Sequence, residues 1–443
     1  RAIVLAFLLV GSALAGCLSP ASTDGALKTA ATPGEPAGTN ALTQDWWIRG
    51  QPSGEGHDHK VPAGHENLST PNFHVLGWDP LVWGSTGTTG TGMGCGGTGQ
   101  TKAGQRIALV HSISGPDAFI VADVTDPAAP KYLGDYYMPN AVVWDATITP
   151  DGLHAIVGAY PIGPVFGRNP TLPIGPGAGD ATGFAKIQPM FRDACTGETR
   201  AAGPENYVPY GPGLVMVGLQ DPKNPKLEEW VPQPVIGPHS VSTAQIDNVT
   251  YVMSSVTNLV HSGSYYHFFE VMDSPVGSVL KSLAVIEAPG TVGPTDLNGH
   301  IDVELQKHPI THQLRAYLAN WRTGVEIYDV SNWAMPTQIG HWADGNNGSI
   351  HEAHPLPVLW EGRHYTVAGQ EVGEPVDLPS SWVYILDTTD PAHPKEVSRW
   401  TLPVQVKGEG GLQLSAHYLE VYNRTMVVAN YQGGIWAVDL ANL

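Results

Sequence analysis

Five histidines in this 443-residue chain each open a short stretch that is typical of a β-strand, and together they could hold a metal ion. A neutral imidazole offers one nitrogen lone pair and adds no charge, so several converging imidazoles form a typical transition-metal site. Copper and zinc accept such nitrogen donors, whereas magnesium and calcium prefer oxygen. The five histidines are His74, His239, His300, His354 and His417.

Further donors lie close to these histidines in the sequence. Asp302, His351 and Glu352 are a few residues from them, and Asp145 stands where one unit has no histidine. If a metal binds, we expect three of the five histidines, from adjacent units, to coordinate it. The sequence leaves an alternative open, in which the histidines hydrogen-bond to neighbouring segments and to water without any metal.

Motifs of the common enzyme classes are missing from the sequence. It contains no Gly-x-Ser-x-Gly nucleophile elbow, no phosphate-binding glycine loop before a helix and no His-Glu-x-x-His pair. A second histidine group, His57, His59 and His65, precedes the strand-like units. We interpret it as part of a solvated linker. The alternative is weak metal capture, because the His-x-His spacing on an extended chain puts both rings on one side.

A repeated turn sequence organises the strands that must position these residues. The pattern Asp-x-x-Asp-Pro-x-x-Pro-Lys occurs at 123–131 and 387–395, with a near copy at 218–226 that lacks the first Asp. An apolar β-branched run precedes each copy and a short run ending in an aromatic residue follows it, which predicts strand, turn and strand. The prolines fix φ, and the Asp oxygens can accept the exposed N–H groups of the turn. Weaker copies lie at 271–275, 327–336 and 435–442.

The repeat resembles the LVIVD-repeat family of prokaryotic surface proteins over about residues 73–443. That resemblance implies an all-β fold, a β-propeller of four-stranded blades. Six repeat units predict six blades, with seven as the alternative, and the spacing is typical of propellers. The last unit ends after three strands, so we expect an N-terminal segment, 44–49, to supply the fourth. Equivalent positions on inner strands line the axial channel, so the five histidines are expected to form a ring there.

The N-terminal part of the chain is typical of an exported lipoprotein. Residues 1–16 predict a signal peptide, and Leu14-Ala-Gly-Cys17 resembles a bacterial lipobox in which Cys17 is lipidated. Residues 17–43 have the composition of a flexible tether, and 44–443 form the propeller, with a long loop at 84–105 and an insertion at about 160–213. We therefore expect an extracytoplasmic protein held at a membrane by its lipid.

The two remaining cysteines, Cys95 and Cys195, form an even pair in an oxidising compartment. They lie in the glycine-rich loop and in the insertion, respectively, and a disulfide between them is the expected arrangement. Two free thiols are the alternative.

The charge of the chain limits its partners. A formal net charge of −19 with only 22 Lys and Arg residues argues against nucleic acid. Two functions remain. The first is a non-enzymatic binding module at the cell surface, which engages an extracellular protein or glycan. The second is a copper or zinc metalloprotein, an oxidoreductase, with its site in the axial channel.

Overall fold

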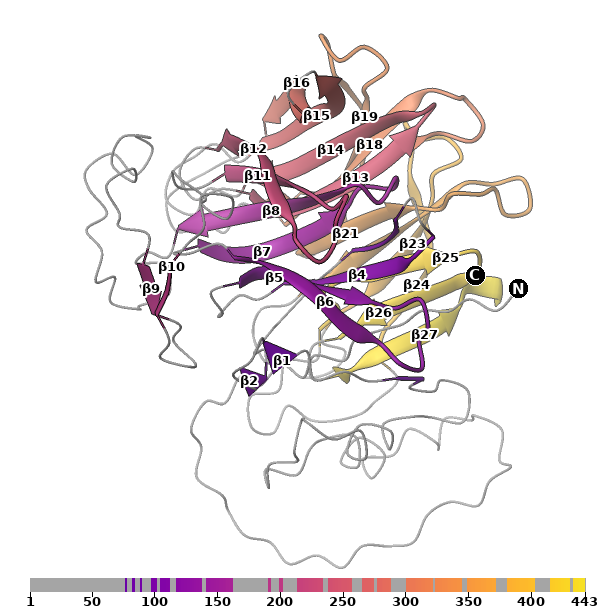
Figure 1. Ribbon diagram of the computed structural model, residues 1–443. Helices are drawn as coiled ribbons and strands as arrows, with labels where there is room; N and C mark the ends of the chain where they lie inside the picture. Colours follow the sequence, from indigo (N-terminus) through magenta and orange to yellow (C-terminus); the bar gives the residue numbers. More distant parts are fainter. Residues whose placement is uncertain are drawn as a thin grey trace, which may run out of the picture.

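The computed structural model is a six-bladed, all-β propeller (Figure 1). Its one helical element among the described residues is a short 3-10 turn, η7 (Leu440–Asn442). The structure describes residues 76–77, 82–83, 88–89, 97–101, 104–111, 117–137, 141–161, 190–192, 199–201, 213–233, 238–256, 265–274, 277–287, 300–321, 323–344, 349–371, 381–402, 415–430 and 433–442.

Each of the first three blades is a four-stranded antiparallel sheet whose strands follow the order of the chain from the inner edge outward. Blade 1 comprises β3 (Thr98–Gln100), β4 (Arg106–His111), β5 (Asp117–Asp123) and β6 (Lys131–Tyr137). Blade 2 comprises β7 (Ala141–Ile148), β8 (His154–Pro161), β11 (Gly213–Gly218) and β12 (Lys226–Pro232). Blade 3 comprises β13 (Pro238–Ile246), β14 (Val249–Val256), β15 (Tyr265–Ser274) and β16 (Gly277–Glu287).

The last three blades repeat this order, and the sixth has three strands among the described residues. Blade 4 comprises β17 (His300–Lys307), β18 (Leu314–Asn320), β19 (Gly324–Asp329) and β20 (Thr337–Trp342). Blade 5 comprises β21 (Ile350–Pro355), β22 (Tyr365–Gln370), β23 (Val383–Asp387) and β24 (Lys395–Trp400). Blade 6 comprises β25 (Leu419–Tyr422), β26 (Thr425–Ala429) and β27 (Ile435–Asp439).

Contacts between inner strands give the order of the blades around the axis. Strand β7 contacts β13, β13 contacts β17, β17 contacts β21, and β21 contacts β25. In Figure 1 the indigo β4 and the yellow strands of blade 6 lie near each other, which agrees with the electrostatic interaction between His111 and His417. The ring therefore brings blade 1 close to blade 6.

Apolar side chains between adjacent blades form the core. Tyr317 and Ile327 of blade 4, for example, pack against Ile350 and Tyr384 of blade 5, and all four side chains are buried. Similar clusters join blades 1 and 2, blades 3 and 4, and blades 5 and 6. Because each blade has a neighbour on each side, both faces of a strand in the middle of a blade can be apolar, as they are in β11, the third strand of blade 2.

The repeated Asp residues stabilise the turns between third and fourth strands, as the sequence predicted. In blade 1, Oδ1 of Asp123 accepts from the Thr125 N–H at 2.9 Å, and Oδ1 of Asp126 accepts from the Ala128 N–H at 3.0 Å. These are local Asx turns that need no distant partner. The same pairs recur as Asp387–Thr389 and Asp390–Ala392 in blade 5, and as Asp329–Ser331 and Asn332–Ala334 in blade 4.

Two glycines let these turns pack against the outer strand of the preceding blade. A Cβ on Gly134 of β6 would lie 2.7 Å from the Lys223 carbonyl oxygen, and a Cβ on Gly340 of β20 would lie 1.9 Å from the Pro391 oxygen. Gly77 stands in the same relation to the turn of blade 1, 2.2 Å from the Pro127 oxygen. Gly77 thus occupies, against blade 1, the place that an outer strand of blade 6 would occupy.

Several sequence expectations concern residues outside the described part of the chain. Residues 1–75, with the signal peptide, Cys17, the expected closing strand 44–49 and His74, are among them, as are Cys95 and Cys195. Within the expected loop 84–105, residues 98–100 form β3, so this strand rather than the segment at His74 is the inner strand of blade 1. The described residues of the expected insertion form a hairpin of β9 (Met190–Arg192) and β10 (Thr199–Ala201), and β1 (Val82–Trp83) pairs with β2 (Thr88–Thr89).

In the described part of the chain, no helix has the length and apolar character needed to cross a bilayer.

Candidate metal centre

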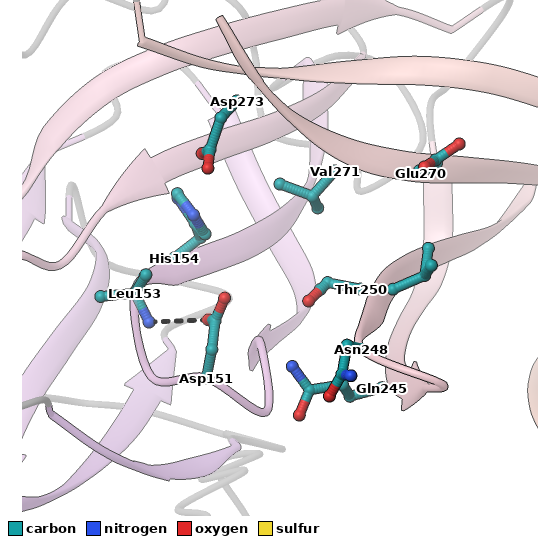
Figure 2. Close-up of a pocket in the computed structure, with 10 residues that line it drawn as sticks. Asp151, Leu153, His154, Gln245, Asn248, Thr250, Glu270, Val271 and Asp273 are labelled. Carbon is teal, nitrogen blue, oxygen red and sulfur yellow. Dashed lines mark hydrogen bonds between the residues drawn. The ribbon is translucent and has the colours of Figure 1, made fainter.

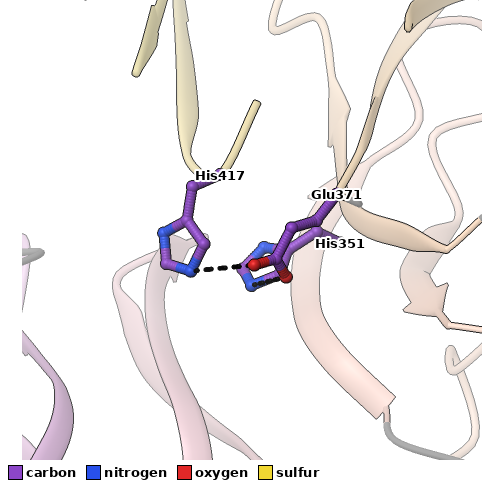
Figure 3. Close-up of side chains that lie close together, drawn as sticks. All are labelled: His351, Glu371 and His417. Atoms are coloured by element: carbon purple, nitrogen blue, oxygen red, sulfur yellow. Dashed lines mark ion pairs between the residues drawn. The ribbon is translucent and has the colours of Figure 1, made fainter. Parts of the chain in front are cut away.

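Three potential metal donors meet at one end of the innermost strands of blades 5 and 6. Figure 3 shows His351, Glu371 and His417, whose donor atoms all lie within 4.8 Å of one another. Nε2 of His351 is 3.6 Å from one carboxylate oxygen of Glu371, and Nε2 of His417 is 4.0 Å from the other. Two donors bound to one ion lie about 3–4 Å apart, since each bond is about 2.0–2.2 Å long. The three side chains are therefore spaced closely enough for one ion.

Strand pairing places Glu371 beside His351. Ile350 pairs with Gln370, and the Glu371 N–H donates to the Ser349 carbonyl at 2.8 Å, so Glu371 follows directly after β22 at the level of His351. His417 precedes β25, where its N–H donates to the Ala429 carbonyl at 2.8 Å. Two adjacent blades thus supply the three side chains.

A β-bulge turns His351 out of the regular strand alternation. The pairing of β21 with β22 shifts between Ile350 and Glu352, so His351 is the extra residue of the bulge. The same shift occurs in β13 between Pro238 and Ser240, which makes His239 the extra residue in blade 3. His239 and His351 therefore hold equivalent positions in their blades.

His239 reaches the cluster from across the ring. Its ring centre is 6.2 Å from that of His351, and the ring centres of His351 and His417 are 4.3 Å apart. Beside them, Oγ of Ser240 lies 3.3 Å from the Tyr418 hydroxyl. Blades 3 and 6 are opposite each other in a ring of six, so these contacts lie at the axis of the propeller.

Burial keeps the histidines of this region neutral. Burial lowers the pKa of His417 to about 3, helped by the nearby His239 and His111, and lowers the pKa of His239 to about 4. For His351 burial is again the main cause, with His417 and His239 adding to it, and the pKa falls well below its usual range. Neutral imidazoles keep the lone pairs that a metal ion requires.

His351 lacks the hydrogen bonds that two other buried histidines, His308 and His364, make. Its side chain is 0% exposed, and neither ring nitrogen has a hydrogen-bond partner. By contrast, His308 and His364 are fully engaged: Nε2 of His308 lies 3.2 Å from the Thr388 carbonyl, and Nδ1 of His364 lies 2.9 Å from the Thr388 hydroxyl. A buried polar group without a partner is unfavourable by about 1–3 kcal/mol, which a bound ligand would remove.

The remaining candidate residues take other places. His354 lies three residues beyond His351 in β21, roughly 10 Å further along the strand, and its Nδ1 is 3.9 Å from Glu304. Glu352 accepts from the Leu419 N–H of blade 6, and Oδ2 of Asp145 accepts from the Val241 N–H of blade 3 at 2.8 Å. These carboxylates join neighbouring blades. Asp302 is buried in the same part of the channel, and for His300 only the backbone is described.

Sequence reasoning did not identify two residues of this region, Glu371 and His111. Each lies at or just after the end of the second strand of its blade, where no repeat marks it. Burial lowers the pKa of His111 to about 3, and the Val143 carbonyl, which it hydrogen-bonds, opposes that shift. The only sequence signal for either residue is its position after a buried strand.

A separate cavity lies between blades 2 and 3. It has a volume of about 220 Å³ and is lined by His154, Asp151, Asp273 and other polar residues (Figure 2). Nδ1 of His154 is 2.7 Å from Glu228. In blade 4 the residue corresponding to His154 is Arg315, which pairs with Asp329, the first Asp of the repeat; in blade 2 that Asp is replaced by Gly218. His154 and Glu228 thus replace a structural pair, and we assign no function to this cavity.

No family model and no curated protein matches the chain. Solved structures show a likeness in fold alone. Sqt1 of Saccharomyces cerevisiae is 10% identical over 78% of this chain and 71% of its own, with a TM-score of 0.45. The periplasmic gluconolactonase PpgL of Pseudomonas aeruginosa is 10% identical over 70% of each chain, with a TM-score of 0.41. A protein from Lactobacillus plantarum is 12% identical over 75% and 76%, also with a TM-score of 0.41.

Proposed function

We propose that this protein is a metalloprotein that binds one transition-metal ion, copper or zinc, at the axis of its propeller. His351, His417 and Glu371 would hold the ion. The observation that carries the proposal is the completely buried His351, whose two ring nitrogens have no hydrogen-bond partner while a carboxylate and a second imidazole lie beside it. One metal ion would bind Nε2 of His351, which lies beside the carboxylate, together with His417 and Glu371.

The donor set favours a reactive centre over a purely structural one. Three protein donors leave at least one coordination position for water or a substrate, as in catalytic zinc sites. The His417 side chain is 27% exposed, so the site is not sealed. With copper bound, the reaction class would be an oxidoreductase, because copper exchanges electrons, whereas zinc has no redox chemistry and would act as a Lewis acid.

Metal analysis tests this proposal directly. The full chain, loaded with copper or zinc and then dialysed, should retain about one ion, and His351→Ala should retain none. His354→Gln is the matched control, because His354 lies in the same strand away from the cluster, and it should retain the ion. Free metal ion at a concentration about 100 times the dissociation constant should stabilise the fold by about 2.7 kcal/mol, and a chelator should remove this gain. A wild-type chain with no bound metal and no chelator effect would refute the proposal.

We also propose that the propeller acts outside the cytoplasm, anchored by lipid at Cys17, as a surface binding module of the LVIVD-repeat type. The lipobox-like sequence and the spacing of the repeats support this proposal. Radiolabelled palmitate should enter the wild-type chain and not Cys17→Ser, and glycan-array binding of the purified protein would identify a sugar ligand. Equal labelling of both chains would exclude the anchor.

A further inference from the structure

We infer that Tyr418 closes the axial channel next to the proposed metal site, so that an ion reaches the site only from the side of Glu371. This inference rests on the proposed function and adds to it one residue that controls access and positions two ligands. It is carried by a contact between opposite blades and by the burial of one level of the channel.

The Tyr418 side chain crosses the channel. Tyr418 directly precedes β25 of blade 6, and its hydroxyl lies 3.3 Å from Oγ of Ser240 in β13 of blade 3. Either hydroxyl can donate to the other. Blades 3 and 6 are opposite each other in the ring, so their innermost strands can make this contact only at the axis. Oγ of Ser240 also lies 3.3 Å from Nδ1 of His239, which helps to fix the serine.

The side chains around Tyr418 are shielded from solvent. In blades 2, 3 and 5 the residue that follows the bulge of the inner strand is Asp145, Ser240 and Glu352, respectively. All three are buried, and so is Asp302 of blade 4. Tyr418, which is partly exposed, holds the corresponding place in blade 6, one residue after His417. The tyrosine therefore covers a closed level of the channel.

Solvent reaches the levels on either side of Tyr418. On the side of the metal site, the His417 side chain is partly exposed. On the other side, two residues further along the inner strands, Glu304 and His354 are partly exposed and Glu420 is exposed. The channel is thus open at two levels and closed at the level between them.

The Tyr418 ring also positions two of the proposed ligands. Its centre is 5.0 Å from that of His351 and 4.6 Å from that of His417, and the ring planes meet at 82° and 78°. Edge-to-face contacts of this kind are favourable and restrict the orientation of both imidazoles. Groups that pack behind metal ligands tune the site by fixing the ligands in this way. Loss of the ring should therefore weaken metal binding as well as open the channel.

The far half of the channel is acidic. Glu420 interacts electrostatically with Asp302 and Glu304 of blade 4 and with His354 of blade 5, so its carboxylate faces the channel. Carboxylates raise the local concentration of cations. While Tyr418 closes the channel, this charge cannot speed metal entry, and once the tyrosine is removed it should draw cations to the site.

The rate of zinc association with the metal-free full chain tests this inference. Stopped-flow competition with a zinc-binding dye measures the rate. Tyr418→Ala should raise the association rate constant about tenfold at low salt, and added salt should reduce the gain. Tyr418→Phe keeps the ring in the channel and should associate at the wild-type rate. Tyr422→Ala, at an exposed tyrosine of the same blade, is the matched control and should also keep the wild-type rate.

A double variant identifies the route of entry. Glu420→Gln should leave association unchanged when Tyr418 is present and should remove most of the gain in the Tyr418→Ala background. Circular dichroism of each metal-free variant checks that it is folded. Tyr418→Val takes the place of Tyr418→Ala if the alanine variant does not fold.

Each contrary result has a distinct meaning. A folded Tyr418→Ala that binds zinc at the wild-type rate, or a gain that Glu420→Gln does not reduce, would overturn the closed channel and leave the three-residue site standing. Faster dissociation with unchanged association would equally overturn it, because Tyr418 would then only position the ligands. A wild-type chain that binds neither zinc nor copper would overturn the proposed function and this inference with it.

Discussion

Arg315 and Asp329 form an ion pair inside blade 4, with 2.6 Å between Nη1 and Oδ2. The Arg315 side chain is only 5% exposed, so its charge depends on this carboxylate. Asp329 is the first Asp of the repeat in blade 4. In blade 5 the equivalent Asp387 pairs instead with Arg363, two residues before its strand partner Tyr365, and the Arg363 side chain is 61% exposed. The same repeat position therefore carries a buried pair in one blade and a solvated pair in another.

These two pairs should respond differently to the same substitution. Asp329→Ala leaves a buried guanidinium without its carboxylate and should lower the free energy of unfolding by about 3–5 kcal/mol. Asp387→Ala leaves an exposed arginine and should lower it by about 1–2 kcal/mol, which is chiefly the loss of the turn hydrogen bond to Thr389. Urea unfolding followed by fluorescence measures both. Equal losses would contradict the role of burial.

The glycine contact between blades 4 and 5 should tolerate no side chain. A Cβ at Gly340 would overlap the Pro391 carbonyl oxygen, which belongs to a proline-fixed turn and has little freedom to move. Gly340→Ala should therefore lower the melting temperature by several degrees, since about 1–3 kcal/mol is typical of overpacking. Gly369→Ala is the control, because its Cβ would meet only the end of the Leu419 side chain at 3.1 Å. A larger fall in melting temperature for Gly369→Ala than for Gly340→Ala would contradict this prediction.

Removing the charge of Glu371 should weaken metal binding without unfolding the protein. Glu371→Gln keeps the size of the side chain and replaces an anionic donor with a neutral amide. The copper dissociation constant should rise at least tenfold, or about 1.4 kcal/mol. Glu304→Gln, next to His354 and outside the cluster, should leave the constant unchanged. Competition titration with a coloured chelator measures the copper dissociation constants of both variants. An equal rise in the two constants would argue against Glu371 as a ligand.

The buried Asp302 should make stability depend on pH. Burial, with the nearby Glu420 adding to it, raises the pKa of Asp302 to about 7 in the folded chain. The stability that its protonated form contributes is complete below pH 4 and is lost as the pH rises through 7. Asp302→Asn avoids this loss, so the variant should gain stability relative to wild type between pH 5 and pH 8.

The size and control of this effect follow from its cause. We expect a gain of roughly 1–3 kcal/mol in the metal-free protein, measured by urea unfolding at the two pH values. Glu361→Gln, at an exposed position, is the control, and its difference in stability from wild type should be the same at pH 5 and pH 8. A stability difference between Asp302→Asn and wild type that is the same at pH 5 and pH 8 would contradict a pKa of about 7 for Asp302 in the folded chain.

The cysteine pair predicted from the sequence can be tested by alkylation. Cys95 and Cys195 should both be protected in the unreduced protein and both react after reduction, as counted by mass spectrometry. Two labelled thiols before reduction would show that no disulfide joins them.

The sequence alone determined the blades of this protein. The Asp and Pro residues of the repeat act within a few residues of one another, as the hydrogen bonds of Asp123 and Asp126 demonstrate, so their spacing marks each third strand. The third strands end at Asp123, Gly218, Ser274, Asp329, Asp387 and Asp439. These ends lie at or within the copies of the repeated turn sequence, because turn chemistry of this kind is local.

Only the tertiary structure decided which donors meet. The sequence aligned His354 with His239, but a bulge gives that position to His351, and a difference of three residues moves a side chain roughly 10 Å along a strand. Glu371 joins the site through pairing of β22 with β21, and the His239 ring contacts His351 from across the ring of blades. Strand register and ring closure are long-range properties, so residues far apart in the chain converge on a site that no local pattern specifies.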